Sequence, residues 1–207
     1  MHIFIKFFKS ITTLLGILLL LTGCGSESSS TNYPTTLGDA ASIISDINAT
    51  MAPSPTTLKS INNTIATIIK TDVDTQNQKE ATTFTKEILY CDISGVVEST
   101  NEGTLATITK IQKFNACKDE QHLQDGFVTI NYDAMRSEGK FPQIVTLRVE
   151  EDYTFNEIVL KKGTLVKSSI EYNNDNTIAL IKVTTNGNVE YQYGNYQLIN
   201  DSDSLSF

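Results

Sequence analysis

The hydrophobic residues of this chain change their spacing once, near residue 81, and this change limits the possible folds more than any other feature. Before it, apolar residues recur every three or four positions, which is the period of an amphipathic helix. After it, apolar and polar residues alternate, so that Val145, Leu147 and Val149, for example, would share one face of a strand. The chain is therefore predicted to place helices before a β domain.

Two amphipathic helices are predicted over residues 36–70. Thr36 and Asp39 have the spacing of a capping box, which indicates the start of the first helix. Pro53-Ser54-Pro55 ends it and begins the second, with the serine as N-cap and the second proline at the first helical position. The apolar stripe of the second helix consists of Leu58, Ile61, Ile65, Ile68 and Ile69. We interpret both helices as core elements, because neither polar face is basic enough for a membrane surface.

The β domain is predicted over residues 81–200 as an antiparallel meander of about eight to ten strands, because turn-forming residues interrupt the β-branched segments about every ten positions. Asn186-Gly187 has the composition of a hairpin turn, which predicts that residues 177–185 pair with residues 189–193. The fold class is thus α+β and mainly β, with two helices packed on a curved sheet, half-barrel or sandwich. Residues 201–207 are predicted to form a disordered tail.

The start of the chain has the pattern of an export signal. Two lysines precede an apolar run over residues 11–21, which is shorter than the roughly 20 residues of a membrane-spanning helix. The run ends at Leu21-Thr22-Gly23-Cys24, which resembles the lipobox of bacterial lipoproteins. The resemblance implies that residues 1–23 are removed as a signal peptide and that Cys24 receives a diacylglycerol. The serine-rich residues 24–35 are then predicted to be a flexible tether.

This resemblance implies a location in the bacterial cell envelope, where two or more acyl chains give stable membrane anchoring. Gly25, and not Asp, follows Cys24, and in enteric bacteria the sorting rule of this family then favours the outer membrane. Removal of residues 1–23 takes away two lysines and no acid, so the net charge moves from -8 to -10. Because such a chain repels phosphate, we predict no nucleic acid partner. The predicted partners are the membrane, through the lipid, and another envelope protein.

With Cys24 assigned to the anchor, Cys91 and Cys117 remain as an even pair in an oxidising compartment. We predict a disulfide between them. The alternative is a metal-binding or catalytic thiol, for which His122 is the one histidine of the mature sequence. The surrounding residues resemble an arrangement in bacterial envelope lipoproteins of unassigned activity, which implies an exported β-rich domain. The matching residues are Cys91-x-x-Ser94-Gly95-Val96, Phe114-Asn115-Ala116-Cys117, Leu123 and Gly126-Phe127-Val128-Thr129-Ile130.

The mature sequence contains no recognisable catalytic motif. A hydrolase would need His122 as its base, with Asp119, Glu120 or Asp125 to orient the ring. No Gly-x-Ser-x-Gly nucleophile motif accompanies this histidine. We therefore interpret it as a loop residue and predict that the protein is not an enzyme and needs no cofactor.

One acidic segment begins like a calcium-binding loop. Asp72-x-Asp74 has the initial spacing, but Asn77 and Thr83 stand where such a loop needs Gly and Glu. We therefore interpret this segment as a polar linker and predict no metal site.

Tyr191, Tyr193 and Tyr196 form the densest aromatic group in the chain. On a strand, Tyr191 and Tyr193 would share a face, and an exposed pair could stack on a sugar or anchor a protein partner. The alternative is that these tyrosines complete the core beside the last strand.

These observations favour a membrane-anchored envelope lipoprotein with a non-enzymatic binding or structural role. The alternative is a carrier of lipid or another hydrophobic ligand, because helices on a curved antiparallel sheet are similar in outline to the half-barrel lipoprotein-carrier proteins. A carrier needs an open apolar cavity, whereas a filled core would exclude it. The residues expected to line that cavity include Val145, Leu147, Ile170 and Ile181.

Overall fold

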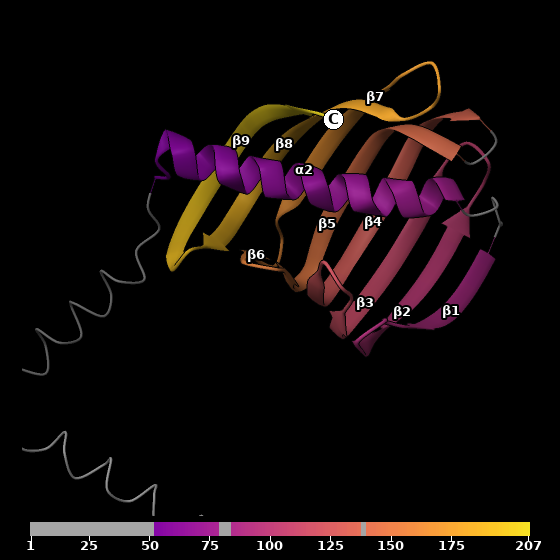
Figure 1. Ribbon diagram of the computed structural model, residues 1–207, viewed down its shortest axis with the longest axis horizontal. Helices are drawn as coiled ribbons and strands as arrows, with labels where there is room; N and C mark the ends of the chain where they lie inside the picture. The colour runs from indigo at the N-terminus through magenta and orange to yellow at the C-terminus, as the bar shows by residue number, and fades with distance from the viewer. Residues whose placement is uncertain (1–51, 79–83, 138–139) are drawn as a thin grey trace, which may run out of the picture. The chain divides into compact units, whose positions relative to one another are not determined.

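The computed structural model describes residues 52–78, 84–137 and 140–207, in which one long helix crosses one face of an antiparallel sheet (Figure 1). The helix is α2 (Pro55–Gln78). The strands are β1 (Phe84–Tyr90), β2 (Ser94–Gly103), β3 (Ile108–Lys118), β4 (Leu123–Ser137), β5 (Lys140–Phe155), β6 (Ile158–Leu160), β7 (Leu165–Tyr172), β8 (Ile178–Tyr191) and β9 (Gly194–Ser206). The predicted leader, lipobox, tether and first helix fall on residues 1–51, outside the described residues.

The nine strands form a meander, which confirms the predicted mainly β fold. Each strand pairs with its neighbour in sequence, except that β6 and β7 together occupy one position between β5 and β8. β1 lies at one edge of the sheet and β9 at the other (Figure 1). Within these residues, no helix has the length and hydrophobicity needed to span a bilayer.

Helix α2 begins where the sequence predicted it but ends later. The Ser54 side chain caps it, because its hydroxyl oxygen accepts the N–H of Thr57 at 3.1 Å. The prediction that the helix ends at residue 70 and continues as a polar linker is wrong. No Gly or Pro interrupts residues 56–78, and Val73 extends the apolar stripe by a further fully buried residue.

The core lies between α2 and the face of the sheet that the helix covers. Four of the five predicted stripe residues of α2 are buried, and Leu58 is half-buried against them. The helix packs mainly on β5, β8 and β9, which present alternating apolar residues such as Val145, Leu147 and Ile181. Full burial of each aliphatic side chain contributes about 1.5–3 kcal/mol, so this contact holds the helix on the sheet.

The predicted hairpin at Asn186-Gly187 is wrong, because both residues lie inside β8. The turn that connects β6 to β7 packs on this point, where Lys161 N–H donates to the Asn188 carbonyl at 2.9 Å. A Cβ on Gly187 would lie 2.5 Å from Thr164 Oγ1, so the glycine permits a close approach and a bulge, with no chain reversal. The chain instead reverses at Gln192 and Tyr193, whose φ angles of 47° and 67° match a type I′ turn.

The predicted disordered tail at residues 201–207 is also wrong, since β9 continues to Ser206 beside β8. Asn62 on α2 donates to the Asp201 carboxylate at 2.7 Å, and the N–H of Phe207 donates to the Ala179 carbonyl at 3.1 Å. The polar composition misled the prediction because an edge strand can carry serines on its solvent side and an aspartate that binds α2, while its backbone bonds to the neighbouring strand.

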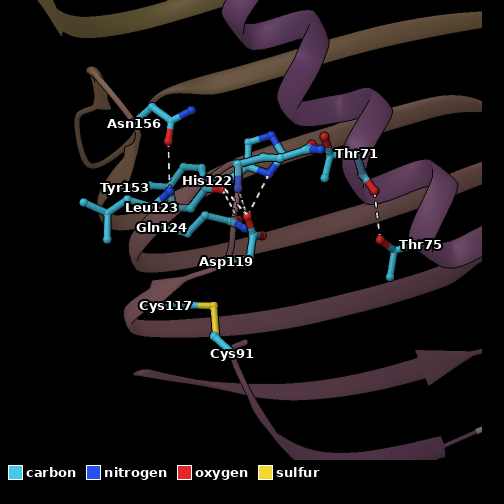
Figure 2. Close-up of polar contacts among 11 residues, drawn as sticks. Thr71, Thr75, Cys91, Cys117, Asp119, His122, Leu123, Gln124, Tyr153 and Asn156 are labelled. Atoms are coloured by element: carbon cyan, nitrogen blue, oxygen red, sulfur yellow. Dashed lines mark hydrogen bonds and ion pairs between the residues drawn. A yellow bond between two sulfur atoms is a disulfide. The ribbon is translucent and has the colours of Figure 1, made fainter. Parts of the chain in front are cut away.

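A disulfide joins Cys91, directly after β1, to Cys117 in β3, which confirms the predicted pair (Figure 2). The two Cα atoms are 5.5 Å apart. The ladders of β2, β3 and β4 all contain bulges near this end of the sheet, at Gly95, after Phe114 and at Gly126. The disulfide therefore ties the end of β1 to β3 at the point where the pairing of β3 with β2 and with β4 is irregular.

Candidate functional site

Three polar side chains meet between α2 and the sheet. The sequence did not predict this contact, because Asp72 was assigned to a polar linker. Asp72 on α2 accepts a hydrogen bond from the Lys110 ammonium group on β3, with Nζ and Oδ1 2.6 Å apart. The second carboxylate oxygen accepts the hydroxyl of Tyr132 on β4. The Lys110 side chain is only 2% exposed, and Tyr132 is fully buried. The cluster thus links the helix to two strands through a charged contact that is shielded from water.

The electrostatic environment keeps the nearby phenols protonated. Burial raises the pKa of Tyr132 well above its ordinary value, and the charge and hydrogen bond of Asp72 raise it further. Burial and the charge of Asp72 also raise the pKa of Tyr153, whose hydroxyl donates to Gln124 Oε1 at 2.8 Å. Both tyrosines therefore remain neutral donors at physiological pH.

A cavity of about 90 Å³ lies beside this cluster. Polar and apolar side chains line it together. The polar residues include Asp72, Lys110, Gln112 and Gln124, and the apolar residues include Ile68, Phe114, Val128, Ile130, Leu147 and Phe155. Ligand sites for small molecules usually enclose about 300–1,000 Å³, so this cavity is too small for an acyl chain.

The residues named for a carrier cavity are core residues. Val145, Ile170 and Ile181 are buried in the main hydrophobic cluster, and only Leu147 borders the cavity. In the described part of the chain, α2 fills the face that a carrier would offer to its cargo (Figure 1). Transport of a hydrophobic ligand would therefore require α2 to leave the sheet.

His122 lies in the loop between β3 and β4, close to Asp119 (Figure 2). His122 Nδ1 lies 3.5 Å from Asp119 Oδ1, and the His122 ring packs at a tilt of 36° against Phe155, with a centroid distance of 4.9 Å. Burial acts to raise the pKa of Asp119, but hydrogen bonds from the N–H groups of Gln121 and His122 outweigh it and hold this pKa below its ordinary value. Asp119 Oδ1 accepts the N–H groups of Gln121 and His122 at 2.7 and 2.6 Å, so this carboxylate stabilises the loop.

The three C-terminal tyrosines do not form one surface. Tyr191 and Tyr196 are half-buried and pack against the core, as the alternative interpretation proposed. Tyr193 is fully exposed, because it occupies the turn between β8 and β9. The prediction that Tyr191 and Tyr193 share a strand face is wrong, since the strand ends between them.

A second group of exposed residues lies at the opposite edge of the sheet. Ile88 and Tyr90 share the face of β1 that points away from α2 and are 61% and 85% exposed. Ile93, which follows in the loop to β2, is also exposed. We call these three residues the β1 patch. Sequence reasoning missed it because alternation predicts two faces of a strand and does not show which face a helix covers.

The charged cluster had a detectable sequence signal. Asp72 lies four residues after Ile68 and next to Val73, within the apolar stripe of the helix. Lys110 alternates with Ile108 and with Gln112 on the buried face of β3. Opposite charges on two buried faces indicate a pair.

No group of three or more His, Cys, Asp or Glu side chains that could hold a metal ion occurs among residues 52–78, 84–137 and 140–207. No family model matches the chain. Searches of curated proteins and of solved structures found no similar protein.

Proposed function

We propose that this protein is a lipid-anchored lipoprotein of the bacterial envelope that acts by binding another protein through the β1 patch. The lipobox at residues 21–24 supports the anchor, and the acidic composition argues against nucleic acid as the target. The observation that carries the binding role is the exposure of Ile88 and Tyr90 on an edge strand. In this proposal His122 packs on Phe155 and takes part in no reaction.

The two edges of the sheet differ in a way that supports this role. Natural proteins usually protect an edge strand with charged side chains, because its backbone can pair with another chain. β9 follows this rule, since Asp201 and Asp203 accompany its exposed Ile199. β1 also carries charged residues, Lys86 and Glu87, but it places two large apolar side chains, Ile88 and Tyr90, side by side on one face. Clustered apolar exposure of this kind is typical of interaction sites.

Site-specific photo-crosslinking in native membranes tests the binding role. A photoreactive phenylalanine analogue replaces Tyr90 in one variant and Tyr193 in the other. Tyr193 is the matched control, because it is an exposed tyrosine at the opposite edge. We expect a discrete crosslinked protein product from position 90 and none from position 193. Equal products from both positions, or none from position 90, would contradict the proposal.

The anchor has its own test, which does not depend on the partner. Cells fed a clickable fatty-acid analogue should label the wild-type chain and should not label Cys24→Ser. Equal labelling of both chains would show that Cys24 carries no lipid and would remove the anchored part of the proposal.

A further inference from the structure

We infer that the partner of the β1 patch is a second copy of this chain, joined edge to edge through β1 in antiparallel orientation. This inference rests on the proposed function and adds the identity of the partner and the register of the two strands. Ile88 lies on the twofold axis of the dimer, opposite Ile88 of the second copy. The two sheets then continue as one through the shared edge.

The backbone of β1 presents the required groups. Among the described residues, β1 pairs with β2 alone. The N–H of Cys91 donates to the Gly95 carbonyl of β2, so in an antiparallel ladder Leu89 and Glu87 also point their backbone groups toward β2. By the same alternation, Lys86, Ile88 and Tyr90 direct their N–H and C=O groups outward. The side chains of these three residues occupy the face away from α2.

Side-chain contacts favour this register. Twofold antiparallel pairing keeps each face of the sheet continuous, so an outward-facing residue of β1 lies opposite an outward-facing residue of the second copy. With Ile88 on the axis, Lys86 lies opposite Tyr90, and the two Lys86 ammonium groups are kept apart. Direct opposition of the two Lys86 residues would bring like charges together, which destabilises a sheet.

This register also matches the exposed side chains. Ile88 packs on its own copy, and the aliphatic part of each Lys86 covers a Tyr90 ring, an arrangement that also permits a cation–π contact. The outward-facing residues from Lys86 to Tyr90 form three residue pairs across the axis, which give about six backbone hydrogen bonds, since each hydrogen-bonded pair exchanges two. The exposed apolar side chains of β1, Ile88 and Tyr90, thus lie at the centre of the interface.

Cysteine crosslinking tests the dimer and its register together. Ile88→Cys and Lys86→Cys are each introduced into the full-length chain, in which Cys91 and Cys117 already form a disulfide. Hydrogen-bonded residue pairs in antiparallel strands have Cα atoms about 5.5 Å apart, within the range for a disulfide. After mild oxidation in membranes, we expect a covalent dimer from Ile88→Cys alone and none from Lys86→Cys alone. A dimer from Lys86→Cys alone, or only from the mixture of the two variants, would overturn the proposed register.

Mass measurement of the detergent-solubilised full-length chain provides the second test. Ile88→Lys places two like charges on the axis, whereas Ile199→Lys changes an isoleucine of similar exposure on β9. We expect dimers from the wild type and from Ile199→Lys, and monomers from Ile88→Lys. A monomeric wild type at concentrations up to about 100 μM, together with no crosslink from Ile88→Cys, would overturn the inference, since even small interfaces associate in this range. If position 90 then crosslinks to a different protein, the proposed function stands and the second copy is excluded.

Discussion

Removal of the Lys110 charge should destabilise the fold strongly, because this lysine neutralises a carboxylate beneath α2. Lys110→Met keeps most of the aliphatic volume and deletes only the ammonium group. Asp72 then keeps one hydrogen bond, from Tyr132, and has no opposing charge. The interface between the helix and the sheet would then contain a buried anion without a compensating charge.

The geometry sets the size of the loss. Two charges about 4 Å apart attract by about 4 kcal/mol at an effective dielectric constant near 20. Removal of one partner from a buried pair typically costs about 3–5 kcal/mol, which agrees with this value. We therefore expect Lys110→Met to lower the free energy of unfolding by about 3–5 kcal/mol and the Tm by roughly 6–20 °C. Such a loss is a large part of the total stability of a typical domain.

Urea denaturation followed by circular dichroism measures this loss, and two further variants isolate its cause. The ion pair between Lys70 and Asp74 has the same 2.6 Å separation but is substantially exposed, so Lys70→Met should cost less than about 1 kcal/mol. The double variant Lys110→Met/Asp72→Asn should recover most of the stability, because the amide oxygen can still accept the Tyr132 hydroxyl. A loss below about 1 kcal/mol for Lys110→Met, or no recovery in the double variant, would refute the reasoning.

Three further outcomes are expected. Replacement of both Cys91 and Cys117 by Ala should lower stability by about 3–4 kcal/mol, as chain entropy predicts for a loop of this length; a midpoint equal to the wild type under oxidising conditions would contradict it. Because the folded-state pKa of Tyr132 is raised above its unfolded value, its contribution is complete below about pH 10 and is lost as pH rises further, at about 1.4 kcal/mol per pH unit. The free energy of unfolding, measured by denaturation at a series of pH values from 9 to 12, should therefore fall less steeply with pH for Tyr132→Phe than for the wild type. Identical slopes would show that Tyr132 does not cause this pH dependence. Deletion of residues 201–207 should destabilise the fold because it removes the end of β9 and the Asp201 contact, and unchanged stability would show that this segment contributes nothing.

The elements that the sequence predicted correctly depend on local signals. Ser54 and Pro55 mark the start of α2 because an N-cap and a proline at the first helical position act within one turn. The alternation of Val145, Leu147 and Val149 identified the buried face of β5, since side chains on a strand point in opposite directions regardless of what packs on them. The disulfide was predictable by counting once Cys24 had been assigned to the anchor.

The predictions that failed concern residues whose role depends on distant parts of the chain. Gly187 resembles a turn glycine, but its conformation accommodates Thr164 from the β6–β7 turn. Asp201 resembles a tail residue, but Asn62 on α2 binds it. Asp72 resembles a linker or calcium ligand, and its partners on β3 and β4 are 38 and 60 residues away in sequence. The local composition around each of these residues does not specify which distant residue it contacts.

The sequence by itself determined the order of helix and strands, the helix start, the alternating faces and the cysteine pair, because each depends on neighbouring residues or on a simple count. The lipobox also depends on adjacent residues, and its assignment stays a prediction. Only the tertiary structure decided which face of the sheet is covered by α2. This choice buries the charge of Lys110 and leaves the β1 patch exposed. Burial is a property of the packed layers, so the same alternating pattern produces a core on one face of the sheet and an interaction surface on the other.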